Sequence, residues 1–206
     1  MLKKFRYFYL LPRELSRRFF ILFNRWILKL NDVKFGSKVM IYNRFYLLKH
    51  LSANVTLGDN FSFSSGCCFN PLSRNVKGSI YAGRNAKICI GNNVGVSSAC
   101  IWAANSITIG NYVKIGSDSI ILDTDCHNLD YIKRRTPATD ISNSAPINIE
   151  DDVLIGTRCI ILKGVTIGAR SIIGSGSIVT KSIPSDCIAA GNPCKVIKII
   201  EKNKKK

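Results

Sequence analysis

The chain has 206 residues and a formal net charge of +17, from 30 Lys and Arg residues against 13 Asp and Glu residues. This length allows one domain and a short additional element. The charge favours an anionic partner, either lipid headgroups or a phosphate-bearing ligand. Nucleic acid is not expected as a partner, because the sequence has no aromatic-interleaved basic motif and no helix-turn-helix pattern.

The cysteines and histidines argue against two further kinds of site. The eight cysteines form no C-x-x-C pair, and His50 and His127 are the only histidines, so we expect no metal site. Cys67, Cys100 and Cys159 each lie four positions after an apolar residue of the repeat described below. A small apolar side chain suits that position, and we expect these thiols to be core residues in a reducing cytosol.

Residues 1–30 are predicted to form a basic amphipathic helix. At 100° per residue, large apolar side chains gather on one side and basic side chains on the other. The apolar side consists of Phe5, Phe8, Leu15, Phe19, Phe23, Trp26 and Leu30, and the basic side of Arg6, Arg13, Arg17, Arg18, Arg25 and Lys29. Pro12 is expected to divide the helix into two pieces. The longest apolar run is too short to cross a bilayer, and arginines interrupt what would be the core of a signal peptide.

Two roles remain open for this helix. It could cap the open end of a repeat structure, whose core and strand edges need to be covered. Alternatively, it could lie on an anionic membrane, with its aromatic residues in the interface and its arginines at the headgroups. The two roles do not exclude each other.

A six-residue period dominates the rest of the chain. From residue 149, every sixth residue is aliphatic: Ile149, Ile155, Ile161, Ile167, Ile173 and Val179. The same phase appears upstream in three looser sets, which are Ile109, Ile115 and Ile121; Ile90, Val96 and Trp102; and Leu57, Phe63 and Phe69. So short a unit is one strand plus one turn, and it buries its apolar side chain only by stacking on its neighbours. The period therefore predicts an all-β solenoid.

The period stops after Ile121 and resumes at Ile149. The intervening sequence begins DTDCHNLD, and residues 128–146 are polar and have no core-forming pattern. Insertions in repeat proteins are extruded onto a binding face. We therefore expect a loop beside an active site. It begins after His127, and a histidine can act as a general base near neutral pH.

Residues from about 55 to 200, with the hexads and the closing sequence ILKGVTIGARSIIGSGSIVTKSIPSDCIAAGNPCKVIKII, resemble the hexapeptide-repeat acyltransferases, which are left-handed parallel β-helices. The resemblance is to the sugar O-acetyltransferase branch, of the maltose and galactoside acetyltransferase and capsule or lipopolysaccharide acetyltransferase type. It implies a left-handed β-helix over residues 31–200, preceded by the helical segment 1–30. The basic tail, residues 201–206, is expected to be disordered.

The resemblance implies roles for the residues around the start of the loop. In this family the catalytic histidine ends a coil and begins the extruded loop, as His127 does. Asp125 could orient the imidazole ring and stabilise its charged form, and Asp123 could bind acceptor hydroxyls. Asn128 stands where the maltose and galactoside branch usually has proline, and we expect it on the substrate side. Ala103 replaces an acidic sugar-binding residue of that branch, so a different sugar is expected.

The resemblance also implies a site for acetyl-coenzyme A, in the groove between two β-helices of a trimer. The residues that it assigns to the pantetheine arm and its surroundings are Gly156, Thr157, Gly174, Ser175, Thr180 and Lys181, and those that it assigns to the nucleotide phosphates are Lys195 and Lys198. Small residues let an extended ligand approach the backbone, and lysines act as point charges for phosphate. A backbone N–H near Thr157 is the expected oxyanion donor. For Lys195 and Lys198, a solvated basic tail remains the alternative.

These features predict an acetyl-CoA-dependent O-acetyltransferase that acts on a sugar hydroxyl in surface polysaccharide or lipopolysaccharide biosynthesis. One alternative is an N-acetyltransferase of a nucleotide-linked aminosugar or an antibiotic. Another, of a different class, is a non-catalytic β-helix scaffold. We expect a homotrimer with a sugar or glycolipid acceptor and a cytoplasmic location. If residues 1–30 bind lipid, the location becomes peripheral, at the inner face of the plasma membrane.

Overall fold

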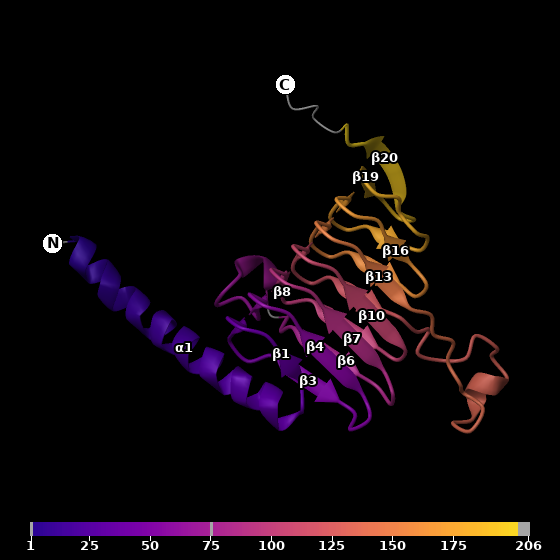
Figure 1. Ribbon diagram of the computed structural model, residues 1–206, viewed down its shortest axis with the longest axis horizontal. Coiled ribbons are helices and arrows are strands. Elements are labelled where there is room, and N and C mark those ends of the chain that lie inside the picture. The colour runs from indigo at the N-terminus through magenta and orange to yellow at the C-terminus, as the bar shows by residue number, and fades with distance from the viewer. Residues whose placement is uncertain (1, 75, 202–206) are drawn as a thin grey trace.

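Each hexad of the repeat folds into one short strand and one turn, and successive strands join three different sheets. Equivalent strands of successive coils therefore lie side by side and in parallel, as β4 (Asn54–Leu57), β7 (Lys87–Ile90) and β10 (Ser106–Ile109) do (Figure 1). The structure is a computed structural model that describes residues 2–74 and 76–201. All of the predicted disordered tail except Glu201 lies outside the described residues.

The described strands form three sheets, named A, B and C. Sheet A contains, in spatial order, β1 (Lys34–Phe35), β4, β7, β10, β13 (Ile147–Ile149) and β16 (Thr166–Ile167). Sheet B contains β2 (Met40–Tyr42), β5 (Ser62–Ser64), β8 (Gly95–Ser97), β11 (Lys114–Ile115), β14 (Leu154–Ile155), β17 (Ile172–Ile173), β19 (Cys187–Ala190) and β20 (Lys195–Ile199). Sheet C contains β3 (Tyr46–Lys49), β6 (Ser79–Ala82), β9 (Cys100–Ala103), β12 (Ile120–Leu122), β15 (Ile160–Leu162) and β18 (Ile178–Val179). Each coil therefore turns at three corners, which we call A–B, B–C and C–A.

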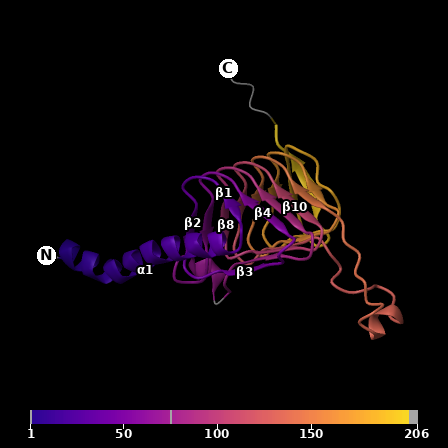
Figure 2. The same cartoon turned by 60° about the horizontal axis from the view of Figure 1, so that its bottom comes forward.

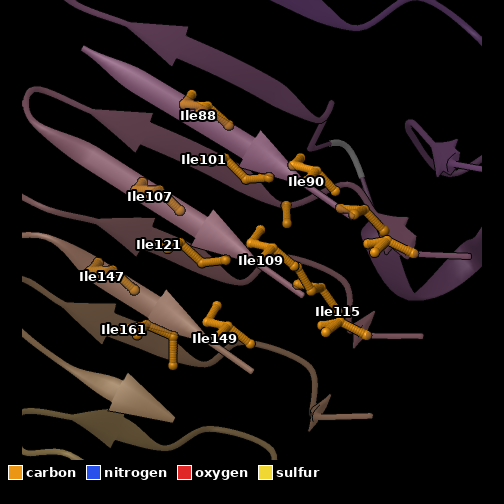
Figure 3. Packing of buried hydrophobic residues seen from close by; sticks show 14 of the residues in the cluster. Ile88, Ile90, Ile101, Ile107, Ile109, Ile115, Ile121, Ile147, Ile149 and Ile161 are labelled. Atoms are coloured by element: carbon orange, nitrogen blue, oxygen red, sulfur yellow. The ribbon is translucent and has the colours of Figure 1, made fainter. Parts of the chain in front are cut away.

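The core is a stack of aliphatic side chains enclosed by the three sheets. The six residues of the C-terminal period, from Ile149 to Val179, are all 0% exposed. In Figure 3 the isoleucines of sheet A, such as Ile107 and Ile147, lie in a row beside those of sheet C, such as Ile121 and Ile161. Because each coil buries its apolar residues only against the next coil, the predicted solenoid of stacked hexads is confirmed.

The predicted inward positions are wrong at two places. Trp102 faces outward from sheet C and stacks on Tyr81 at 3.9 Å between ring centroids, while Ile101 fills the core. The core positions Val96 and Ile101 are five residues apart instead of six, so the inward and outward faces of β9 are exchanged relative to the period. Phe69 lies outside the core, in a second excursion between β5 and β6 that contains the 3-10 helix η1 (Pro71–Ser73).

The prediction for the cysteines holds only in part. Cys159 is buried, as expected, and its thiol lies 3.2 Å from the carbonyl oxygen of Gly174. Cys67 is exposed and Cys100 half-buried, so the prediction of core thiols is wrong for both. Cys67 belongs to the same excursion as Phe69, and Cys100 lies on the outward face of the shifted strand β9.

Helix α1 (Leu2–Leu30) is continuous, so the predicted break at Pro12 is wrong. A proline removes one hydrogen bond, and the turns on both sides keep theirs. The last turns of α1 cover the open end of the β-helix, where Leu28 is fully buried. The Asn24 side chain donates hydrogen bonds to the carbonyl oxygens of Ile41 and Asn43 at 3.0 and 2.8 Å. Arg17, further toward the N-terminus, donates to the hydroxyl of Tyr42, and the N-terminal part of α1 extends beyond the coils (Figure 1).

The excursion between β12 and β13 leaves the solenoid at the C–A corner as a long arm (Figures 1 and 2). Its base is closed by an antiparallel bridge between Thr124 and Ser144 and by a hydrogen bond from Thr124 Oγ1 to Ser142 Oγ of 3.0 Å. Its tip contains the 3-10 helix η2 (Lys133–Arg135). The arm therefore projects its polar sequence beyond the body of the coils.

Candidate functional site

His127 lies at the start of the arm, at the C–A corner, and its side chain is 67% exposed. Its Nδ1 lies 2.6 Å from Oδ2 of Asp140, a carboxylate in the returning half of the arm. Oδ1 of Asp140 accepts the backbone N–H of Asn128 at 2.7 Å. That bond and the contact with His127 hold the pKa of Asp140 below its usual value, so it is a carboxylate at neutral pH.

This geometry assigns the two ring nitrogens of His127. A carboxylate only accepts hydrogen bonds, so Nδ1 must carry the proton that Asp140 receives. In the neutral ring Nε2 then keeps a lone pair and faces away from the pairing carboxylate. The arrangement can take a proton from a hydroxyl and stabilise the resulting imidazolium, because the carboxylate is already in place.

Asp125, which is predicted to orient this ring, does not contact it in the structure. Its Oδ2 lies 3.2 Å from Nζ of Lys163, on the next coil, and its partner is therefore a lysine rather than the histidine. Cys126 has a left-handed backbone conformation, with a φ of 64°, which turns the chain between Asp125 and His127. The ring then meets the far side of the arm, where Asp140 lies.

The side chains of Asp123 and Asn128, which are predicted to bind the acceptor, form hydrogen bonds within the chain. Asp123 is 0% exposed, and its two oxygens accept the backbone N–H groups of Ala104 and Asn105 at 2.7 and 2.8 Å. The Asn128 side chain donates to the carbonyl oxygen of Ile141 and accepts the backbone N–H of Asp130, both at 2.9 Å. Both side chains therefore hold the corner and the arm in shape.

A groove of about 520 Å³ runs along the outer side of sheet B to the B–C corner. Three of the residues predicted to contact the pantetheine arm line it, namely Gly156, Thr157 and Ser175. Further along, the groove is lined by small polar side chains that the sequence did not single out, including Ser64, Ser97 and Ser117. The groove is open to solvent and can accept an extended ligand.

The two glycines at this corner are also required by the stacking of the coils. A Cβ atom on Gly156 would lie 2.6 Å from the backbone nitrogen of Ser175, and one on Gly174 would lie 2.8 Å from Cβ of Ala190. The backbone N–H of Thr157 donates to Ser175 Oγ at 3.2 Å. The expected oxyanion donor therefore already has a partner within the chain.

The remaining predicted donor residues lie elsewhere. Thr180 and Lys181 are exposed at the C–A corner, directly after β18, on the same side of the coil stack as His127. Lys195 and Lys198 are exposed on β20, which pairs antiparallel with β19 at the end of sheet B. The structure thus places the predicted residues at the B–C corner, at the C–A corner and on the last strand of sheet B. The two corners are separated by the width of sheet C, about 10–15 Å for strands of this length.

Among the described residues, no group of three His, Cys, Asp or Glu side chains is arranged to hold a metal ion. No helix in the described part of the chain is long and apolar enough to cross a membrane.

The sequence of this chain is similar to those of known hexapeptide-repeat transferases. Residues 146–181 match the family described as bacterial transferase hexapeptide (six repeats). The galactoside O-acetyltransferase of Escherichia coli K12 is 38% identical over 122 residues, which cover 59% of this chain and 58% of that protein. The matched segments span less than two thirds of the first curated relatives, at 44%, 23% and 58% of their lengths.

Solved structures extend the likeness to nearly the whole chain. A maltose O-acetyltransferase from Clostridium difficile 630 is 26% identical with a TM-score of 0.52, over 92% of this chain and 87% of the other. An N-acyltransferase from Bacillus cereus, solved with dTDP-4-amino-4,6-dideoxyglucose and coenzyme A, has a TM-score of 0.69 at 16% identity, over 87% and 90% of the two chains. The fold is the predicted left-handed parallel β-helix.

Proposed function

The chain belongs to the hexapeptide-repeat transferase family, and we propose on this basis that it is an acetyl-CoA-dependent acetyltransferase whose acceptor is a sugar hydroxyl. The observation that carries the proposal is the pair formed by His127 and Asp140 at the start of the extruded arm. In addition, an open groove is lined by Gly156, Thr157 and Ser175. We further propose that the product belongs to surface polysaccharide or lipopolysaccharide biosynthesis, and that the reaction takes place in the cytoplasm.

The proposed reaction is a direct transfer in a ternary complex. Nε2 of His127 takes the proton of the acceptor hydroxyl as its oxygen attacks the thioester carbonyl of acetyl-CoA. The C–S bond then breaks, and the coenzyme A thiolate leaves and takes up the proton from the imidazolium. Asp140 keeps Nδ1 protonated and balances the charge of the ring throughout.

We propose a homotrimer, and the division of the site between two corners supports an assembly in which neighbouring subunits share each site. His127, Thr180 and Lys181 lie at the C–A corner, whereas Gly156 and Ser175 lie at the B–C corner of the same chain. A histidine side chain does not span the width of sheet C, about 10–15 Å. In a symmetric assembly the C–A corner of one subunit can face the B–C corner of its neighbour, which completes the site.

We predict that Asp140→Asn lowers kcat about a hundredfold, since a misplaced ring loses much of its catalytic advantage. The affinity for acetyl-CoA should stay the same, because Asp140 lies in the arm and not in the groove. Steady-state kinetics and calorimetry with acetyl-CoA measure the two quantities. Asp125→Asn is the matched control, because this carboxylate pairs with Lys163 and not with His127. A larger loss of kcat in Asp125→Asn than in Asp140→Asn would return the orienting role to Asp125.

We also predict that the double variant Lys195→Ala, Lys198→Ala binds coenzyme A more weakly but binds pantetheine as the native protein does. Both lysines are exposed on β20, and only coenzyme A carries the nucleotide phosphates that their ammonium groups would meet. Calorimetric titration with each ligand separates the two effects. An equal loss of affinity for both ligands would mean that the two lysines are solvated and do not contact the phosphates.

Two alternative functions can be distinguished from the proposed one by experiment. An N-acetyltransferase of an aminosugar would use the same histidine and carboxylate to deprotonate an amine, and assays with matched amino and hydroxyl sugars distinguish the two. A scaffold without catalysis would need neither the His127–Asp140 pair nor the groove. Failure of the native protein to bind acetyl-CoA in calorimetry would favour the scaffold.

We propose in addition that α1 contacts an anionic membrane surface through its exposed apolar face. Leu15, Phe19, Leu22, Trp26 and Leu30 are each between 55% and 70% exposed, and their spacing places them along one side of the helix. Such a row of leucines and aromatic residues is suited to the interface of a bilayer, with basic residues at the headgroups. The cap formed by the last turns of α1 does not use this face, so both roles can coexist.

The membrane contact predicts that Leu15→Gln, Leu22→Gln and Trp26→Gln together reduce co-sedimentation with anionic vesicles severalfold and leave the unfolding temperature within a few degrees of the native value. All three side chains are exposed, so little core packing is lost. Deletion of residues 1–30 is unsuitable as a test, because Leu28 is buried in the cap. If the native protein ignores anionic vesicles at low salt, α1 has no role on a membrane.

A further inference from the structure

The groove on sheet B continues beyond the residues that the donor would use. It runs from Ser175 and Gly156 across β11, β8 and β5 to Tyr42 on β2, at the base of α1. Four strand spacings separate β14 from β2 in sheet B, which corresponds to about 19 Å. This distance is longer than one sugar ring, so the groove can hold an acceptor of several units.

Several of the side chains that line this part of the groove carry hydroxyl or amide groups. Ser62, Ser64 and Ser97 present hydroxyls along it, and Ser64 Oγ donates to Ser97 Oγ at 3.2 Å. The Lys114 side chain lies over Gly95 and donates from Nζ to the carbonyl oxygen of Asn93 at 3.1 Å. At the B–C corner, Asn70 Nδ2 donates to Ser117 Oγ at 3.1 Å. Small hydroxyl and amide groups suit the hydroxyls of an extended glycan.

At its far end the groove joins a second compartment of about 360 Å³ beneath α1. The two share Tyr42 and Ser64 as lining residues, so they are contiguous. The helix contributes Arg13 and Arg17 to the second compartment, and both guanidinium groups lie over aromatic rings. Arg13 lies 5.8 Å from the ring centroid of Phe69, and Arg17 lies 4.6 Å from that of Tyr42.

The charge of this compartment remains positive after its internal pairs are counted. Glu14, the one carboxylate among the residues that line it, lies 3.5 Å from Arg17 and 3.6 Å from Arg18. Among the described residues, no carboxylate pairs with Arg13. Arg17 donates from Nη2 to the hydroxyl of Tyr42 at 3.1 Å, which fixes its guanidinium at the end of the groove. Two oriented guanidinium groups can each donate hydrogen bonds to one of the two phosphate groups of a diphosphate.

We propose that the acceptor is a glycan carried on a diphosphate, with the diphosphate held by Arg13 and Arg17 and the sugars laid along sheet B toward the acetyl donor. This inference rests on the proposed function, because it names the substrate class of the same groove. A diphosphate linkage occurs both in nucleotide-linked sugars and in lipid-linked ones. The exposed apolar face of α1, which includes Leu22, lies on the opposite side of the helix from Arg13 and Arg17 and does not line this compartment.

The test is calorimetric binding to the full chain of three probes, which are inorganic pyrophosphate, UDP-N-acetylglucosamine and farnesyl diphosphate. The double variant Arg13→Gln, Arg17→Gln should weaken binding of each diphosphate about tenfold or more. Lys87→Gln with Arg84→Gln removes the same charge from exposed positions outside both compartments and should leave binding unchanged. Tighter binding of farnesyl diphosphate than of UDP-N-acetylglucosamine, with no binding of farnesol, identifies the lipid-linked source, and the reverse order identifies the nucleotide.

Two results would overturn the proposal. In the first, the arginine variant binds pyrophosphate as tightly as the native protein does. In the second, the control variant loses as much affinity as the arginine variant, which would mean that only the net charge matters. Acetyl-CoA is titrated into all three proteins in parallel. If the native protein binds diphosphates but not acetyl-CoA, the proposed function fails. If acetyl-CoA binds normally and the arginine substitutions do not change diphosphate binding, only the proposed diphosphate site is wrong.

Discussion

His127→Ala should lower the rate of acetyl transfer by about a hundred- to ten-thousand-fold, which is the usual cost of losing a general base. No other described side chain that contacts Asp140 can replace the imidazole, because the carboxylate otherwise accepts only the backbone N–H of Asn128. The side chain is 67% exposed, so its loss leaves the core unchanged. Turnover is measured by release of coenzyme A with a sugar acceptor.

The matched control for this variant is His50→Ala, the other histidine of the chain. His50 is exposed between β3 and β4 and its Nδ1 lies 2.8 Å from Ser52 Oγ, away from both the groove and the arm. Its removal should leave turnover unchanged. Acetyl-CoA affinity and thermal unfolding of His127→Ala should match those of the native protein. If His127→Ala keeps more than a tenth of the native rate, this residue is not the base.

Two inactive variants should restore activity to each other when they assemble together. His127→Ala removes the base at the C–A corner, and Ser175→Trp places a large ring in the groove at the B–C corner, where Ser175 is exposed. If each site takes one corner from each of two subunits, every trimer that contains both variants has one intact site, about a third of the native number. Each variant alone should be nearly inactive.

The mixed trimers are obtained by co-expression with two different tags and purification over both. Trimers that carry two tags on His127→Ala subunits alone serve as the control and should stay inactive. Absence of recovery in the mixed sample, with trimers verified by light scattering, would mean that both corners of one chain serve the same site. A monomer that turns over normally would end the proposal of a trimer.

The period of the sequence determined the architecture. Aliphatic residues at a constant spacing of six can be buried only if each short strand stacks on the next, so Ile149 to Val179 predicted the core without further information. The same period runs through Phe35, Ile41 and Leu47, and could have located the first coil, which begins at β1. The arm was also predictable, because the period stops where the arm begins.

The partners within the site were decided by the tertiary structure. Sequence proximity favoured Asp125 as the partner of His127, but the left-handed turn at Cys126 directs the ring toward Asp140, thirteen residues later. A carboxylate in a polar loop carries no periodic signal, and only the fold of the arm brings it within 2.6 Å.

The roles of the small and acidic residues were likewise determined by the tertiary structure. From the sequence, Asp123 was expected to bind substrate. In the structure both of its carboxylate oxygens accept backbone N–H groups of the preceding coil. The sequence predicted that Gly156 is a glycine because a ligand approaches it. The close approach of the Ser175 backbone on the next coil already requires a glycine at this position. The sequence by itself determines which residues must be buried, because burial follows from a local period. Which polar groups remain free for chemistry depends on contacts between coils, and these exist only once the coils are stacked.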